Sequence, residues 1–218
     1  MFTKNIFPMS LLLAASVWFQ PAVAETSSIV DINTSDIFSI GKKLLSAIED
    51  LGADSEKPST EYSREEFGQG WSDDDGDCQN ARHEVLIAQS QTPVTFKSLK
   101  KCRVLEGSWK SPYSNQLIFK SSQLDIDHVV PLKWAWEHGA ADWTKSKRVR
   151  FANDPLNLLA VEARLNRQKG AKGPSNWLPP ENECQYLLLF TTIIDTYGLT
   201  YSASEGMNAN RLQTKHCD

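Results

Sequence analysis

Several features that define other protein classes are scarce or absent in this sequence of 218 residues. It contains no low-complexity tract and no heptad run of useful length, which excludes a fibrous or largely disordered chain. It also contains no repeat of fixed period, although it holds seven Trp, which excludes a repeat array. The formal net charge is only −4, so the chain as a whole is not a basic coat for nucleic acid. The remaining composition, 40% hydrophobic and 23% charged, is that of an ordinary globular domain.

The apolar run near the N-terminus, at 11–19, falls short of the ~20 residues that a membrane span needs. Lys4 precedes this run and Ala22-Val23-Ala24 follows it, which predicts a secretory signal peptide at 1–24. No Cys follows the run, so a lipid anchor is not indicated. We therefore expect a secreted or periplasmic protein that has no membrane anchor after the signal peptide is cleaved.

Cysteine is also rare, with four residues: Cys78, Cys102, Cys184 and Cys217. None forms a Cys-x-x-Cys pair, which argues against a zinc site built on thiolates. In an exported chain, an even number of Cys predicts two disulfides. Of the three possible connectivities, Cys78–Cys102 with Cys184–Cys217 is preferred because each bond closes a local loop, but the sequence alone does not determine the pairing. A disulfide of this kind contributes roughly 3–4 kcal/mol to stability.

The spacing of apolar residues predicts an α+β domain at 63–218, preceded by a helix and a linker at 25–62. The helix in the leading segment is expected at 36–51. Two helices, at 184–197 and 202–215, are expected to close the chain as a helical hairpin. The second preferred disulfide would join the two ends of that hairpin. The other expected elements are strands at 94–96, 117–119, 124–130 and 158–161, a short helix or strand at 84–89, and helices at 134–138, 143–151 and 162–169.

One strand–turn–helix stretch carries the residues with the clearest chemical meaning. Asp127 and His128 follow one another on the strand, Asn157 lies in the turn, and Asn166 lies on the helix. Carboxylate and amide oxygens suit a hard ion such as Mg²⁺, and a neutral His beside such an ion can take a proton from water. Adjacent residues of a regular strand face opposite sides, so Asp127 and His128 reach one ion only if the strand twists or ends there. If the strand stays regular, Asp125 shares the face of Asp127.

The region from Lys145 to Lys172 holds eight basic residues against two acidic ones, in a chain of negative net charge. Such a local excess is typical of a surface that binds a polyanion. Arg164, Arg167 and Lys169 on the helix, together with Arg82, are therefore the candidate contacts to substrate phosphates. The alternative is that the helix arginines form a solvated face and that Arg82 makes an ordinary salt bridge.

A separate acidic cluster has some of the spacing of a calcium loop. Asp73, Asp75, Asp77 and Glu84 occupy positions 1, 3, 5 and 12 of an EF-hand-like loop. Position 6 is Cys78 rather than Gly, and clear flanking helices are not indicated. A solvated acidic turn is therefore the favoured interpretation.

In the strand–turn–helix stretch the sequence resembles the HNH, or ββα-metal, nuclease superfamily. The shared order is a strand with Asp-His, a loop, an Asn, a second strand, and a helix with Asn-Arg-x-Lys-Gly. More narrowly, the sequence resembles secreted bacterial HNH proteins related to the C-terminal domain of GmrSD-type restriction endonucleases. The segments that carry this likeness are Trp71 with Asp73–Cys78, Arg82–Leu86, Cys102–Trp109, Pro112-Tyr113, Phe151–Val161 and Trp177–Pro180, so the likeness covers 63–218.

The resemblance implies a ββα-metal core embedded in the mixed domain. It implies that His128 is the general base, that Asp127 and Asn166 are metal ligands, and that Asn157 braces the loop over the site. The third position of the HNH signature, often His, is here Asn166, an oxygen ligand that suits Mg²⁺, with Mn²⁺ as a substitute, better than zinc.

The expected protein is an exported, monomeric, metal-dependent endonuclease that hydrolyses phosphodiester bonds of DNA, and RNA stays open as a substrate. Low sequence specificity is expected, because phosphate contacts carry no information about the bases. Two rivals remain. One is a catalytically silent exported module that binds DNA or another polyanion, and its binding would survive a chelator and the change His128→Ala. The other is a nuclease toxin domain, which a neighbouring inhibitor protein would indicate.

Overall fold

The computed structural model describes residues 61–217. The chain divides into two units, residues 1–42 and 43–218, and all the described residues belong to the second unit. The predicted signal peptide, the helix expected at 36–51 and nearly all of the linker lie outside the described residues. Within the described part of the chain, no helix is long and apolar enough to cross a membrane.

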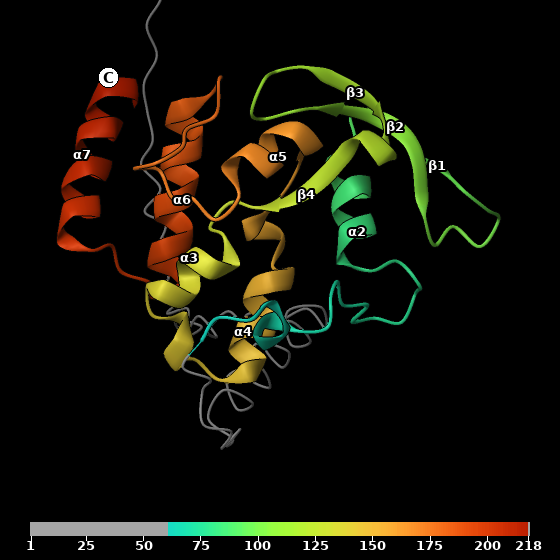
Figure 1. Cartoon of the computed structure of the whole chain (residues 1–218). Coiled ribbons are helices and arrows are strands. Elements are labelled where there is room, and N and C mark those ends of the chain that lie inside the picture. The colour runs from blue at the N-terminus through green and yellow to red at the C-terminus, as the bar shows by residue number, and fades with distance from the viewer. Residues whose placement is uncertain (1–60, 218) are drawn as a thin grey trace, which may run out of the picture. The chain divides into compact units, whose positions relative to one another are not determined.

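The described chain has the mixed α+β fold that the sequence predicts (Figure 1). Its helices are α2 (Ala81–Ala88), α3 (Leu132–Glu137), α4 (Lys145–Asn153), α5 (Ala163–Lys169), α6 (Glu183–Tyr197) and α7 (Ala203–Cys217). Its strands are β1 (Thr95–Phe96), β2 (Val104–Lys110), β3 (Leu117–Lys120), β4 (Leu124–His128) and β5 (Leu158–Glu162). Short 3-10 turns are η1 (Arg64–Phe67), η2 (Ser121–Gln123), η3 (Ala140–Asp142) and η4 (Pro155–Asn157).

The strands form two small antiparallel sheets, one of β1, β2 and β3 and the other of β4 and β5. The pairing of β4 with β5 runs without a break from Leu124 opposite Glu162 to His128 opposite Leu158. β4 therefore stays regular up to His128 and ends two residues before the predicted boundary. Pro131 then precedes the first turn of α3, where its lack of a backbone N–H has no cost. Helix α5 follows β5 directly and packs on both strands of this sheet.

The β4–β5 sheet contributes to two hydrophobic clusters, because successive side chains of a strand face opposite sides. Leu124 and Ile126 of β4, with Leu158 and Ala160 of β5, join the cluster formed with α2 and the first sheet. Val161 joins the other cluster, which includes α3, α4 and α6. Aromatic rings dominate that second cluster, including Phe67, Tyr113, Trp134, Trp136, Phe151, Trp177, Tyr186 and Phe190.

Helices α6 and α7 form the C-terminal hairpin that the sequence predicts (Figure 1). Phe190 and Ile194, one turn apart on α6, are both buried in the core. Gly198 ends α6 with φ 69°, a left-handed conformation that favours glycine. Before α7, the Ser202 N–H donates to the Glu205 carboxylate (3.0 Å) and the Glu205 N–H donates to the Ser202 hydroxyl (3.4 Å). This is the predicted capping box.

Both preferred disulfides are present, and none of the described cysteines is free. Cys184–Cys217 joins the start of α6 to the end of α7, so it ties the hairpin at its open end. Cys78–Cys102 joins the segment before α2 to the loop between β1 and β2. The preference for bonds that close local loops is confirmed.

Strand β2 was not predicted from the sequence. The register of β2 against β3 shifts between Glu106 and Trp109, so apolar residues do not alternate regularly along it. A glycine within the strand also weakens the signal. Gly107 has a packing reason, because an added Cβ would lie 2.7 Å from both the Ser90 hydroxyl and the Trp109 ring.

Candidate active site

Four of the predicted site residues line a cavity of about 400 Å³ at the end of β4. Asp127 and His128 from β4, and Asn166 and Arg167 from α5, line this cavity. A regular strand would direct Asp127 and His128 to opposite sides, but β4 ends at His128. The pairing of β4 with β5 is nevertheless regular through His128, and the two side chains have different partners: Asp127 contacts Lys169 and Tyr113, whereas His128 contacts the Ala152 carbonyl and Trp71. Both residues line the cavity, and the choice between Asp125 and Asp127 as the ligand beside Asn166 stays open.

Asn157 fastens the segment that follows His128. Its Oδ1 accepts a hydrogen bond from the Val130 N–H (2.8 Å), and its Nδ2 donates to the Val130 carbonyl (3.2 Å). Its backbone carbonyl accepts from the Val129 N–H (2.9 Å). The side chain is fully buried, where an unpaired amide would be costly. Asn157 thus holds the chain beyond β4 against the start of β5.

His128 is buried and has a defined tautomer. Its Nε2 lies 2.8 Å from the Ala152 carbonyl oxygen. Because a carbonyl only accepts hydrogen bonds, Nε2 carries the ring proton and Nδ1 keeps a lone pair. Burial lowers the pKa of His128 to about 3, so the ring is neutral near pH 7.

Trp71 stacks on the His128 ring, with centroids 5.3 Å apart and planes 14° from parallel. The segment that carries it is held to α4, because the Ser72 N–H donates to the Asn153 Oδ1 (2.9 Å). Trp71 is one of the residues that carry the family likeness, but no role was predicted for it from the sequence. No local pattern marks it, since the contact joins segments that are far apart in the chain.

Asp127 belongs to a buried polar network. The Lys169 Nζ lies 3.0 Å from its Oδ1 and 2.9 Å from its Oδ2, and also donates to the His128 carbonyl at 2.7 Å. The Tyr113 hydroxyl donates to Oδ2 at 2.5 Å. Burial raises the pKa of Asp127, while the Lys169 ammonium and the Tyr113 hydroxyl act in the opposite direction. An internal cation therefore faces this carboxylate.

The α5 side of the cavity is more open. The Asn166 Nδ2 donates to the Asp125 Oδ2 (3.2 Å), so the amide oxygen is the atom that can serve a cation or a donor. The Arg167 Nε lies 3.6 Å from the same carboxylate oxygen, and the Arg167 side chain is 77% exposed. Arg64 and Lys133 also line the cavity. Three basic side chains thus border it.

The prediction that Lys169 contacts substrate phosphates is corrected by the structure. Its side chain is 0% exposed, and its ammonium is occupied by Asp127 and the His128 carbonyl. On α5, Lys169 lies one turn after the buried Leu165 and on the same face. It points toward the interior and not toward the surface where substrate phosphates would lie.

The structure gives Arg82 an internal role as well. Its Nη2 donates to the carbonyls of Ser121 (3.1 Å) and Leu124 (2.9 Å), so it holds the start of β4. The sequence placed Arg82 among the phosphate contacts, and these bonds direct that nitrogen to the protein backbone instead. Arg164 is exposed on α5, which agrees with either a phosphate contact or a solvated face.

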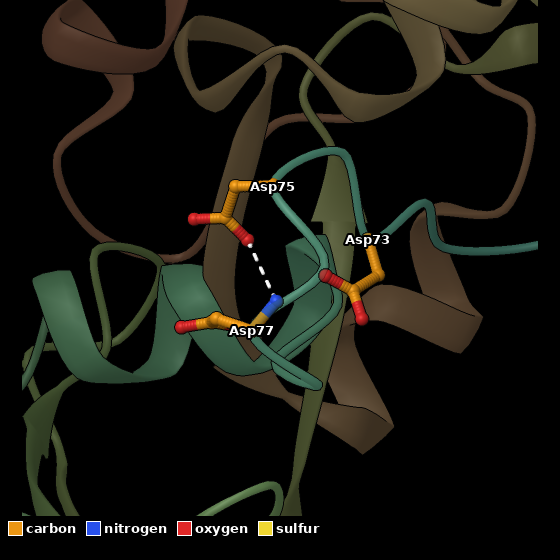
Figure 2. Close-up of side chains that lie close together, drawn as sticks. All are labelled: Asp73, Asp75 and Asp77. Atoms are coloured by element: carbon orange, nitrogen blue, oxygen red, sulfur yellow. Dashed lines mark hydrogen bonds between the residues drawn. The ribbon is translucent and has the colours of Figure 1, made fainter.

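The acidic stretch before α2 forms a compact exposed loop. Asp73, Asp75 and Asp77 each offer a carboxylate oxygen, and these atoms lie within 4.8 Å of one another, close enough to hold a metal ion. Asp75 accepts from the Asp77 N–H (Figure 2), while Asp73 accepts from the N–H groups of Gly76 and Cys78. These bonds account for the shape of the loop, and the solvated acidic turn stays a prediction.

Comparison with known proteins identifies the family. The chain matches the family described as "GmrSD restriction endonucleases, C-terminal domain" over residues 81–201, which is more than half of its length and includes the β4 and α5 residues of the cavity. It is also 39% identical over 152 residues to a protein of Arthroderma benhamiae named "Uncharacterized secreted protein", which covers 68% of this chain and 72% of the relative. No solved structure matches the chain. The chain therefore belongs to the GmrSD restriction endonuclease C-terminal domain family.

Proposed function

We propose that this protein is an exported, metal-dependent endonuclease of the HNH type that hydrolyses phosphodiester bonds of DNA. The observation that carries the proposal is the single cavity bordered by Asp127, His128 and Asn166. The order of elements around it, β4, β5 and then α5, is the order expected of a ββα-metal core. The match to a restriction endonuclease family supports nuclease chemistry on DNA.

His128 acts as the general base. The Nε2–H donates a hydrogen bond to the Ala152 carbonyl, so the lone pair of Nδ1 is available to accept a proton from water. The Trp71 ring and the carbonyl bond together fix the plane of the imidazole. Such pre-orientation matters, because a general base must lie within hydrogen-bond reach of the proton that it removes.

Asp127 and Asn166 would hold a Mg²⁺ ion, with Mn²⁺ as a substitute. Their donor set fits a hard cation, because a carboxylate and an amide oxygen from two elements border one cavity. The Lys169 ammonium contacts both oxygens of Asp127 and the Tyr113 hydroxyl donates to Oδ2, so the ion would share this carboxylate, with its roughly four lone-pair sites, with these two side chains. When bound, the ion would supply positive charge to stabilise the reacting phosphate and the leaving oxygen.

The rim of the cavity favours a substrate with repeated negative charges. Arg64, Lys133 and Arg167 all line it, and Arg167 is largely exposed. Guanidinium and ammonium groups position a phosphate backbone without reading bases. We therefore propose low sequence specificity, with DNA as the main substrate and RNA as a second one. That the protein acts as a monomer stays a prediction.

Export is proposed from three observations. The sequence begins with a predicted signal peptide, both disulfides are formed, and a relative is named as a secreted protein. An exported nuclease would degrade DNA outside the cytoplasm rather than restrict incoming DNA inside it. The bacterial origin and the choice between periplasm and medium stay predictions.

The decisive experiment incubates residues 25–218, with disulfides intact, with supercoiled plasmid in Mg²⁺, Mn²⁺ or EDTA. The expected result is nicking and linearisation that require metal and fall by about 10²–10⁴-fold in His128→Ala. His216→Ala, on α7 and away from the cavity, is the matched control and should cleave like the wild type. The same series on RNA measures the substrate range.

An intact plasmid in every metal, with a mobility shift that persists in EDTA and in His128→Ala, would instead establish a catalytically silent DNA-binding module. A nuclease toxin domain would show the same cleavage as the proposed enzyme but would be blocked by a dedicated inhibitor protein.

A further inference from the structure

A second groove, of about 550 Å³, lies near the start of β4, whereas the candidate active site lies at its end. Its walls come from the start of α2, the loop between β1 and β2, and η2. His83, Lys97 and Arg103 line it, together with the Cys78–Cys102 disulfide. None of the side chains that line the groove is a carboxylate.

The loop from Lys97 to Arg103 concentrates positive charge. Its sequence is Lys-Ser-Leu-Lys-Lys-Cys-Arg, which has four basic residues and no acidic one. The chain as a whole is acidic, so this is a local excess of the opposite sign. All four basic side chains are exposed. In the acidic segment before Cys78, the Asp73 carboxylate accepts hydrogen bonds from the backbone N–H groups of Gly76 and Cys78.

His83 adds a directed hydrogen-bond donor to the groove. The Val104 N–H donates to its Nδ1 at 3.2 Å, so the ring proton is on Nε2. Burial and the charges of Arg82 and Arg103 lower the pKa of His83. The Nε2–H of His83 and the side chains of Lys97 and Arg103 therefore line the same groove as donors.

The loop is held in one shape. Cys78–Cys102 ties it to the segment before α2. The Lys97 N–H donates to the Arg103 carbonyl (2.8 Å), and the Lys101 N–H donates to the Ser98 carbonyl (3.0 Å). A loop that is already ordered loses little conformational entropy when it binds a ligand.

β4 sets the separation between the groove and the candidate active site. Ser121, just before β4, lines the groove, and its carbonyl accepts from Arg82. From Leu124 to His128 a strand of five residues spans about 13 Å. This length corresponds to the axial rise of about four base pairs of DNA. The groove therefore lies toward one end of β4 and the candidate active site toward the other.

We propose that this groove, formed by His83, Lys97 and Arg103, is a second contact site for the phosphate backbone of the nucleic acid. The proposal rests on the proposed function, because it assigns the same substrate to both sites. The groove would hold DNA a few nucleotides from the bond to be cut and would not take part in the chemistry. Its contribution is affinity that depends on salt concentration and not on base sequence.

The test measures binding of a fluorescein-labelled 30-base-pair duplex by fluorescence anisotropy in EDTA, over a series of NaCl concentrations. The groove variant is Lys97→Gln with Arg103→Gln. The control is Arg211→Gln with Lys215→Gln on α7, which removes the same charge from exposed positions of the C-terminal helix. Each lost phosphate contact lowers the slope of log K against log salt by about 0.9.

The expected result is a slope lower by about 2 and affinity at least roughly tenfold weaker at 0.1 M salt for the groove variant, with the control like the wild type. Equal slopes in the two variants would overturn the proposal. If the wild type cleaves DNA in Mg²⁺ but the two variants have equal slopes, the second contact site is refuted and the proposed nuclease activity stands. If the groove variant has a lower slope but the wild type does not cleave DNA, the contact site stands and the nuclease activity is refuted. If the wild type binds no DNA, both proposals are refuted.

Discussion

Replacing Lys169 with Met tests whether its ammonium is an internal partner of Asp127 or a surface contact for phosphate. The Lys169 side chain is 0% exposed, and its Nζ contacts both carboxylate oxygens and the His128 carbonyl within 3.0 Å. Met keeps most of the apolar stem, so the main change is the lost charge. Removing one partner of a buried ion pair typically costs about 3–5 kcal/mol. In a chain of this size, that loss lowers Tm by roughly 6–20 °C.

The assay is urea unfolding followed by Trp fluorescence, with disulfides intact and EDTA present. Lys172→Met is the matched control, because Lys172 is exposed on the segment after α5, and it should stay within about 0.5 kcal/mol of the wild type. Asp127→Asn combined with Lys169→Met removes both charges. This double variant should be more stable than the sum of the single changes predicts, because no buried charge is left alone.

A Lys169→Met protein that unfolds within about 0.5 kcal/mol of the wild type would refute this reasoning. Such a result would mean that the Lys169 ammonium reaches solvent. If the same variant also bound DNA more weakly, the prediction that Lys169 contacts substrate phosphates would be supported again.

Three further changes have defined outcomes. Trp71→Ala should slow DNA cleavage at saturating substrate by about 2- to 10-fold, since an aromatic stack of this kind is worth roughly 0.5–1.5 kcal/mol. Trp71→Phe should slow cleavage less. An unchanged rate in Trp71→Ala would show that Trp71 does not position His128. Asn157→Ala leaves a buried N–H of the loop unpaired, so urea unfolding should show a loss of about 1–3 kcal/mol, and no loss would contradict the bracing role. Changing Cys184 and Cys217 to Ser should lower the unfolding free energy by about 3–4 kcal/mol, and a stability equal to that of the wild type would show that the bond constrains neither state.

The sequence by itself determined the elements whose signals are local. The helical hairpin follows from apolar residues one turn apart on α6, from Gly198 at its end and from the Ser202–Glu205 capping box. Both disulfide pairs follow the preference for short loops. The strand–turn–helix stretch also placed His128 and Asn166 on elements that meet in the structure. Strand β2 was not predicted because its bulge and Gly107 interrupt the alternation of apolar and polar residues on which strand prediction depends.

Only the tertiary structure decided what each site residue touches. Periodicity could not say whether Asp127 and His128 line one cavity, because the cavity is formed where residues of α3 and α5 come together beside the end of β4. Composition suggested that Lys169 was a surface cation, but the turn of α5 placed it in the interior against Asp127. The stacking of Trp71 on His128 joins segments far apart in the chain. Burial, pKa and ring orientation arise from such distant contacts, and local sequence patterns do not encode them.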